Sequence, residues 1–143
     1  AIKIPTGPGK TSLAKGEIIE AVVLPKPEAR AGDAYLRFIP RTEMDIAVVG
    51  VGVNLTLDEG GIVTAARVAL GAVGPKVILV DAAAKTLIGS KLEDTAIEAL
   101  AEACSVASTP IDDKRGTVAF RKQVVGVLAR RAAQTAYTRA GGK

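Results

Sequence analysis

The sequence predicts an α+β domain in which an antiparallel sheet of three to four strands is followed by helices that pack on it. Three observations support this class. Apolar residues alternate from residue 46 to 57, a glycine-rich turn joins this run to a second one that ends at Val73, and from residue 81 the apolar spacing becomes helical. Strands therefore precede helices along the chain, an order typical of α+β domains and unlike alternating βαβ units.

The first 30 residues combine a linker with one strand signal. Residues 1–15 are rich in Gly, Pro, Lys and Thr, which is typical of a linker. Residues 16–25 contain a β-branched run that Pro25 stops, and they predict a short strand. After a loop, residues 34–38 predict a second extended piece before a turn at Pro40. The length of 143 residues suits one domain, which we place at residues 16–143.

The strongest local signal is a central hairpin at about residues 46–73. One alternate set of side chains in its first strand is apolar throughout, and the other is mostly small or polar. The apolar set is Ala47, Val49, Val51, Val53, Leu55 and Leu57. The turn Asp58–Gly61 supplies two glycines, which adopt positive φ at little cost. Residues 62–73 are therefore predicted to return as the partner strand, up to Gly74-Pro75.

Three helices are predicted after the hairpin. Residues 81–88 suit a short helix that ends at Gly89, and Ser90 with Glu93 resembles a capping box for the next one. That second helix has an apolar stripe and ends at Pro110; the stripe is Ile97, Leu100, Cys104 and Ala107. A longer helix is predicted over residues 117–137. Its expected apolar side is Phe120, Val124, Val127, Leu128 and Ala132.

Composition excludes several kinds of active site. The chain has no histidine, which removes histidine-dependent catalytic triads and most catalytic zinc sites. Its single cysteine, Cys104, cannot hold an iron–sulfur cluster or form an internal disulfide, and it suits a reducing, cytoplasmic setting. No apolar run is long enough for a transmembrane helix, and residues 1–10 lack the apolar core of a signal peptide. The absence of an initiator Met suggests an excised or processed segment.

Charge is distributed unevenly along the chain. Residues from Lys114 onward carry eight basic side chains and no acidic one, although the net charge of the whole chain is only +4. Such a segment can bind nucleic acid or an acidic protein surface, or it can simply form a solvated helix face. Against nucleic acid, aromatic residues that would stack on bases make up only 3% of the chain. A stand-alone protein- or nucleic-acid-binding module remains the alternative interpretation.

Five local patterns suggest sites, and each has a simpler structural explanation. Gly7–Thr11 resembles the end of a phosphate-binding loop, but Ile4 stands where that motif requires its first glycine. Gly50-Val-Gly52 lies inside a strand, where glycines indicate close approach by another group more often than a dinucleotide site. Glu43 and Asp45 with Arg41 suit a structural ion pair. Cys104 suits a core position, and residues 112–115 suit helix capping.

Several segments, read in order, resemble one family. Residues 38–49 are similar to the Arg-x-x-x-Asp-Ile-Ala segment of the flavin subunits of molybdenum hydroxylases, the xanthine dehydrogenase and carbon monoxide dehydrogenase family. Residues 66–75 resemble the next strand of those subunits, and residues 110–131 resemble their terminal helix. Residues 7–11 and 16–19 also match the passage that leaves the flavin domain. The resemblance is colinear over nearly the whole chain.

The resemblance implies a division of labour between domains. It implies a carbon monoxide dehydrogenase flavoprotein C-terminal-domain fold, preceded by a missing FAD-binding domain to which residues 1–15 are the linker. The domain would pack on that FAD domain and flank the isoalloxazine ring. Electrons would arrive from a molybdopterin site through two [2Fe-2S] clusters, held by a molybdenum subunit and an iron–sulfur subunit. This fragment alone is not expected to be catalytic, to bind nucleic acid or to span a membrane.

Two residues are candidates for contact with the flavin. Members of the family usually have a lysine near the flavin four residues before the position of Arg41, and this sequence has Arg37 there. Arginine keeps the charge but differs in shape and cannot be deprotonated. A branched apolar residue at the position of Ile19 often touches the ring in relatives, although core packing explains Ile19 equally well.

Overall fold

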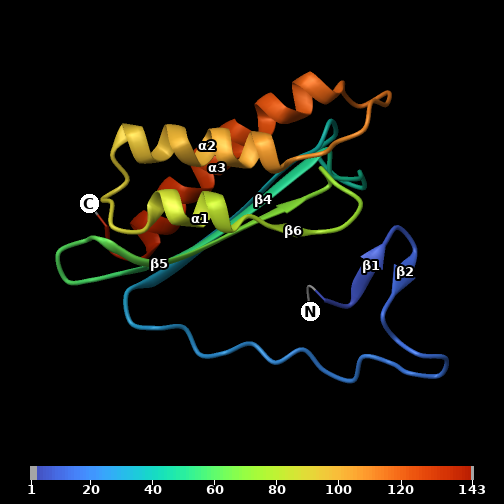
Figure 1. Cartoon of the computed structure of the whole chain (residues 1–143), viewed down its shortest axis with the longest axis horizontal. Helices are drawn as coiled ribbons and strands as arrows, with labels where there is room; N and C mark the ends of the chain where they lie inside the picture. Colours follow the sequence, from blue (N-terminus) through green and yellow to red (C-terminus); the bar gives the residue numbers. More distant parts are fainter. Residues whose placement is uncertain (1–2, 143) are drawn as a thin grey trace.

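The computed structural model describes residues 3–142, and within them a four-stranded antiparallel sheet carries helices on one of its faces (Figure 1). The elements in chain order are β1 Pro5–Gly7, β2 Lys10–Thr11, β3 Ala31–Phe38, β4 Val49–Leu57, β5 Val63–Gly71, β6 Ile78–Leu79, α1 Asp81–Leu87, α2 Asp94–Ala107 and α3 Val118–Arg139. This arrangement confirms the predicted α+β class, with the sheet first and the helices after it. The short β1–β2 pair forms a separate two-stranded ribbon within the predicted linker.

The sheet has the strand order β3-β4-β5-β6, and its centre is the predicted hairpin. Val53 of β4 lies opposite Val68 of β5, so the strands fold back on each other around residues 58–61. Gly61 has a φ of +81°, and the Asp58 carboxylate accepts the backbone N–H of Ile62 at 2.8 Å. The hairpin prediction is confirmed, although its strands start and end a few residues inside the predicted limits.

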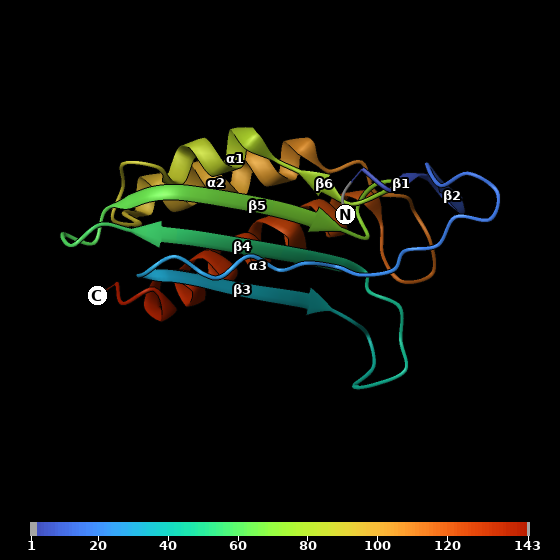
Figure 2. The same cartoon turned by 90° about the horizontal axis from the view of Figure 1, so that it is seen from below.

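The core lies between the sheet and the helices. Alternate residues of β4 from Val49 to Leu57 are buried, as the sequence predicted, and the helices cover this face (Figure 2). α3 contacts β3 and β4 through a row of small side chains, namely Ala129, Ala132, Ala133 and Ala136. The approach is close, because a Cβ added at Gly32 of β3 would stand 2.2 Å from the carbonyl oxygen of Ala136. Cys104 is buried in this core, as predicted, and burial raises the pKa of its thiol to about 12.

The buried side of α3 differs from the predicted one. Leu128 and Ala132 are buried as expected, but Phe120 and Val127 are 39% and 42% exposed. Helical spacing was ambiguous here because apolar residues occur around much of the helix. The sheet selects the face that allows the backbones to approach, and alanine suits that contact better than phenylalanine or valine.

Two further predictions are wrong in detail. Residues 16–25 form no strand: Gly16 lies in a turn with a φ of +90°, and the extended segment that follows has no partner strand among the described residues (Figure 1). The capping box is also absent. Ser90 Oγ instead donates to the Leu87 carbonyl at 2.7 Å and so closes α1, while the carboxylate of Glu93 accepts the N–H of Lys91 at 3.0 Å. α2 begins at Asp94, too late for Ser90 to cap it.

Candidate functional site

One face of the sheet carries no helix, and it presents small side chains with a few large polar ones. It is formed by residues that alternate with the core residues, which we call the open face: Asp33, Tyr35, Arg37, Gly50, Gly52, Asn54, Thr56, Ala65, Arg67, Ala69 and Gly71. In Figures 1 and 2, the extended segment of residues 15–30 runs along this side of the molecule. Tyr35 and Arg37 are exposed members of the same edge strand.

Tyr35 and the two strand glycines form a single packing unit. Tyr35 pairs with Gly52 and Arg37 pairs with Gly50 across β3 and β4. A Cβ at Gly50 would be 2.7 Å from the Tyr35 hydroxyl oxygen, and one at Gly52 would be 3.8 Å from the ring. The ring therefore lies over the glycines while remaining 63% exposed. This contact explains Gly50-Val-Gly52 as a close-approach site.

Neither predicted flavin contact is engaged elsewhere in the described chain. Arg37 is exposed near the end of β3 and forms no hydrogen bond or ion pair within residues 3–142. Ile19 is 52% exposed in the extended segment and does not belong to the core. The structure therefore does not bring Ile19 into the core packing that was its alternative explanation, and among the described residues Arg37 has no charged partner.

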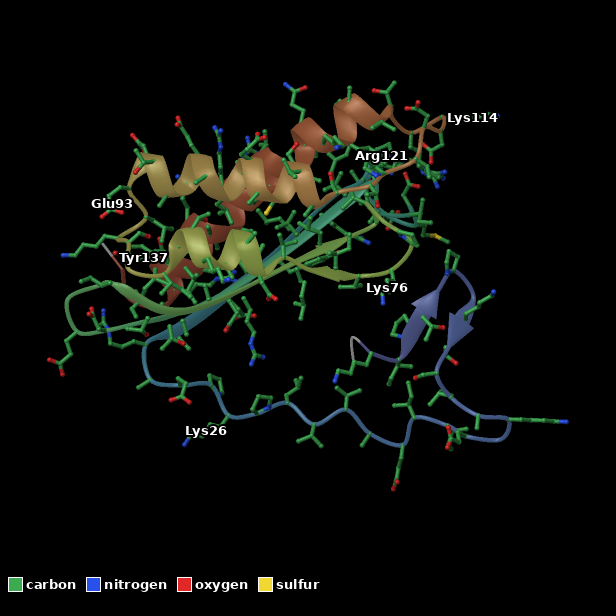
Figure 3. All side chains as sticks on the ribbon, viewed as in Figure 1. Lys26, Lys76, Glu93, Lys114, Arg121 and Tyr137 are labelled. Atoms are coloured by element: carbon green, nitrogen blue, oxygen red, sulfur yellow. The ribbon has the colours of Figure 1, made fainter. Side chains whose placement is uncertain are left out.

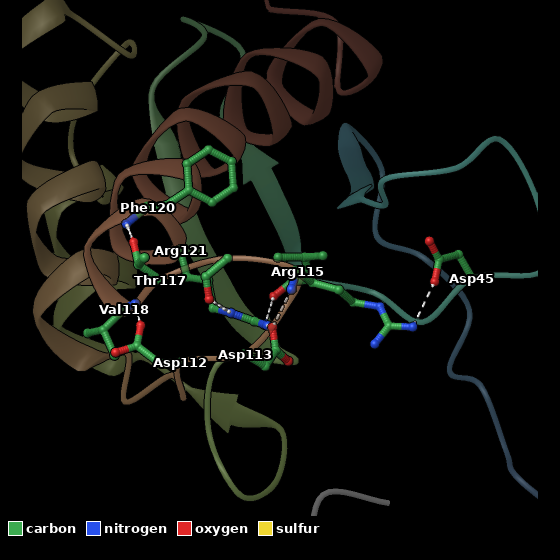
Figure 4. A network of polar contacts seen from close by, with 10 residues as sticks. Asp45, Asp112, Asp113, Arg115, Thr117, Val118, Phe120 and Arg121 are labelled. Atoms are coloured by element: carbon green, nitrogen blue, oxygen red, sulfur yellow. Dashed lines mark hydrogen bonds and ion pairs between the residues drawn. The ribbon is translucent and has the colours of Figure 1, made fainter.

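The loop that follows Arg37 is held in place by ion pairs. Asp45 lies 3.4 Å from Arg41 Nε. It also lies 3.4 Å from Nη2 of Arg115, which comes from the loop before α3 (Figure 4). The Arg41–Asp45 pair was predicted. Burial of the Asp45 carboxylate opposes ionisation, but the N–H of Ile46 and the hydrogen bond and charges of the two arginines outweigh it, so the pKa of Asp45 lies below its ordinary value.

Arg121 is the buried centre of the same network. Its guanidinium donates to the Val48 carbonyl at 2.9 Å, to the Gly116 carbonyl at 3.3 Å and to the Asp113 carboxylate at 2.6 Å (Figure 4). Sequence reasoning missed this residue, because an arginine on a terminal helix looked like part of a solvated basic face. The sequence pattern that could have indicated its burial is the spacing of α3, where Val118 and Val125 lie on the same side of the helix as Arg121. Arg121 fastens the start of α3 to the residue before β4.

Capping confirms another part of the sequence interpretation. Asp112 accepts the N–H of Val118 and Thr117 accepts the N–H of Phe120 at 3.1 Å, so two free donors at the start of α3 are satisfied. Figure 3 places Arg121 and Tyr137 toward opposite ends of α3. At the second end, the Tyr137 hydroxyl donates to the Gly61 carbonyl at 2.7 Å. α3 is thus fixed at both ends.

Three of the eight basic residues from Lys114 onward are engaged within the chain. Arg115 pairs with Asp45, Arg121 is buried, and Arg139 donates to the Asp33 carbonyl at 2.7 Å. These three arginines face different parts of the molecule. They are therefore not available to a continuous stripe of free cations, which argues against the nucleic-acid interpretation.

One cavity lies at an end of the sheet, and a second lies over part of the open face. One of about 520 Å³ lies at the end of the sheet where loops meet β1; its lining includes Pro8, Ile46, Pro75, Ile111 and Arg115. The other, of about 660 Å³, lies between residues 24–28 and the strands β3–β5. Neither is lined by Arg37 or Ile19.

Metal and membrane features are lacking in the described part of the chain. Residues 3–142 contain no group of three or more His, Cys, Asp or Glu side chains that could hold a metal ion. None of the helices in that range is both long and apolar enough to cross a bilayer.

Comparison with known proteins agrees with this architecture. The family model of the CO dehydrogenase flavoprotein C-terminal domain matches residues 34–136. A xanthine dehydrogenase FAD-binding subunit of Escherichia coli O157:H7 is 30% identical over 139 residues, which are 96% of this chain and 47% of that protein. The carbon monoxide dehydrogenase medium chain of Afipia carboxidovorans is 31% identical over 130 residues, or 91% of this chain and 44% of that one.

A solved structure shows the same fold. Reconstituted CO dehydrogenase from Oligotropha carboxidovorans superposes with a TM-score of 0.90 at 28% identity, over 96% of this chain and 48% of that chain. These proteins define a class, the flavoprotein components of xanthine and CO dehydrogenases. The chain belongs to the CO dehydrogenase flavoprotein C-terminal domain family. It spans about half the length of the curated relatives it matches.

Proposed function

We propose that this chain is the C-terminal domain of the FAD-carrying subunit of a molybdenum hydroxylase, and that it closes one side of the isoalloxazine ring. In this proposal residues 1–15 lead in from an FAD-binding domain and residues 16–143 are the flanking domain. Iron–sulfur and molybdenum subunits complete a cytoplasmic oxidoreductase. The observation that carries the proposal is the open face: a helix-free sheet surface with an unengaged cation, in a chain of this family.

The residues on this face suit a neighbour of a planar, electron-accepting group. The glycine and alanine residues of β4 and β5 allow another group to approach the sheet closely. Tyr35 adds an exposed aromatic ring over Gly50. Arg37, two residues from Tyr35, provides a positive charge with no partner of its own in the described chain. The same surface lacks a glycine-rich loop at a helix N-terminus, which is the usual cradle of a pyrophosphate. The chain therefore fits the side of a flavin ring better than its phosphates.

The chain's own contribution would be positional and electrostatic. FAD, when bound by the neighbouring domain, supplies the electron-accepting chemistry. Arg37 would hold a positive charge beside the ring, and Ile19 would exclude water from its edge. The ion pairs of Asp45 and the contacts of Arg121 would keep the loop after Arg37 in one position.

The proposal can be tested on the native protein. We would tag the subunit at its C-terminus, purify it with its partners from its natural host, and measure extracted flavin together with molybdenum and iron. We expect FAD in a 1:1 ratio with the subunit, accompanied by both metals. As a control, calorimetric titration of the 143-residue chain alone should show weak FAD binding or none. A flavin-free native assembly, or sub-micromolar FAD affinity of the isolated chain, would contradict the proposal.

A further inference from the structure

An apolar segment before β3 is exposed to solvent along most of its length. Between Ile18 and Leu24, five large apolar side chains are 52% to 88% exposed: Ile18, Ile19, Val22, Val23 and Leu24. Scattered apolar residues on a surface are ordinary, but five within seven positions form a continuous patch. The core of the domain is complete without them. The segment therefore carries side chains that this domain does not bury.

The backbone of the same segment is also unpaired. It is extended, and from Ile18 to Pro27 no N–H or C=O group takes part in a hydrogen bond within the described chain. The side chains are those that favour strands, because β-branched residues predominate and only Glu20 is charged. Apolar residues fall on both alternate faces, as in strands whose two faces are both covered. Local sequence and backbone shape agree on a strand, and only the partner is missing.

The domain's own sheet does not supply that partner. The edge strand β3 begins at Ala31, and Pro25 and Pro27 lie between it and the apolar segment, where they remove two backbone donors. The segment runs beneath the open face instead of beside β3 in the plane of the sheet (Figure 1). A groove of about 660 Å³ separates its last residues, 24–28, from the strands. The last residues of the segment are therefore separated from the four-stranded sheet.

We propose that residues 17–24 are a β-strand completed by the FAD-carrying half of the subunit, where the strand joins a sheet that is covered on both faces. The inference rests on the proposed function, because it takes that half as the partner. The relatives support this occupant: the E. coli FAD-binding subunit matches 96% of this chain with only 47% of its own length, so more than half of it lies outside the match. The strand would join the two halves by main-chain hydrogen bonds as well as by apolar contact.

Amide hydrogen exchange tests the pairing directly. The 143-residue chain and the native FAD-containing subunit would be compared peptide by peptide. In the isolated chain the amides of residues 18–24 should exchange at nearly unprotected rates, and in the native subunit they should be slowed on the order of 100-fold or more. Peptides from β4 serve as the internal control, because they should be protected in both samples.

A pair of substitutions separates pairing from simple burial. Val22→Pro removes a backbone donor, and Val22→Thr keeps the donor, the branched shape and the strand preference. In the native subunit, Val22→Thr should retain most of the protection of residues 18–24, whereas Val22→Pro should abolish it or prevent stable assembly. Loss of protection in both variants would point to apolar contact alone and would overturn the strand.

The outcomes also distinguish this inference from the proposed function. A native subunit that contains FAD but leaves residues 18–24 unprotected overturns the strand and leaves the flavoprotein role intact. A native subunit without FAD overturns both. Protection that appears only when the iron–sulfur or molybdenum subunit is present, and not in the flavin subunit alone, overturns the choice of partner.

Discussion

The phenol ring of Tyr35 lies across Gly50 of the neighbouring strand, where a Cβ would stand 2.7 Å from the Tyr35 hydroxyl oxygen and 3.3 Å from the ring. Position 50 therefore needs glycine because the Tyr35 ring occupies the space of a Cβ atom, and not because the backbone there has an unusual conformation. It also fixes an exposed aromatic ring two residues from Arg37 on the open face. This pair links the glycine motif of β4 to the proposed site.

Replacing Gly50 with alanine should displace the ring without unfolding the domain. The clash involves the far end of a side chain that is free to turn into solvent, so we expect stability within about 1 kcal/mol of the original chain. The ring resonances of Tyr35 should shift in NMR spectra. Gly71→Ala is the matched control, since no atom lies within 4 Å of a Cβ built there. Unchanged Tyr35 resonances in Gly50→Ala would contradict the contact.

Gly32→Ala should be far more damaging than Gly50→Ala. The added methyl group would stand 2.2 Å from the Ala136 carbonyl oxygen and 2.5 Å from the Ala140 nitrogen, and backbone atoms in the packed β3–α3 contact cannot move aside. We expect a loss of about 3 kcal/mol, at the upper end of overpacking costs. Urea unfolding measures it. Gly52→Ala, with its nearest neighbour at 3.8 Å, should change stability much less, and equal effects at the two positions would refute the explanation.

Stability should depend on the ionisation of Asp113. Its carboxylate accepts the N–H of Arg115 and the guanidinium of Arg121, and these bonds hold its pKa below the ordinary value of 3.8. The unfolded chain therefore takes up the proton first as the pH falls. The stabilisation is complete above the unfolded pKa of about 3.9 and is lost as the pH falls through the folded pKa.

Asp113→Asn should accordingly be less stable than the original chain at pH 6, and the difference should shrink below about pH 4. Chemical unfolding at a series of pH values gives this comparison. Glu102→Gln is the control, because Glu102 is exposed and has no hydrogen bond or ion pair in the described residues. A gap for Asp113→Asn that stays constant between pH 6 and pH 3 would exclude the linkage.

Arg37 should raise the reduction potential of the flavin if it lies beside the ring as proposed. Reduction places negative charge on the ring, and a nearby cation stabilises it. Arg37→Met in the native subunit should lower the FAD potential on the order of 20–40 mV, which is about 1–2 kcal/mol for a two-electron couple. Arg37→Lys should restore most of the difference, because the charge matters more here than the planar shape.

Potentiometric titration separates this role from a surface role for Arg37. Arg67→Met is a suitable control, since Arg67 is another exposed arginine of the open face, on β5. It should change the potential less than Arg37→Met does. An unchanged midpoint potential in Arg37→Met would show that the charge of Arg37 does not act on the flavin, and the domain would then only cover one side of the ring.

The sequence by itself determined the features that depend on neighbours in the chain. Alternation over residues 46–57 predicted β4, which the structure places at Val49–Leu57, and the glycines after Asp58 predicted the reversal, because both patterns express backbone geometry over a few residues. Colinear segments predicted the family, which the comparisons confirm. The role of Arg37 remains a prediction: the structure leaves its charge unengaged, and a flavin contact requires atoms outside this chain.

Only the tertiary structure decided which surfaces meet. Apolar residues surround much of α3, and close contact with the sheet selected the alanine side over Phe120 and Val127. Arg121 is buried because the fold brings the carbonyl of Val48, which is distant in sequence, next to it, and this carbonyl and the nearby Asp113 carboxylate accept hydrogen bonds from its guanidinium. Residues 16–25 contain the β-branched run typical of a strand, yet they form none among the described residues. Pairing and burial depend on groups that the fold brings together. A local preference for a strand therefore produces a strand only where a partner strand is present.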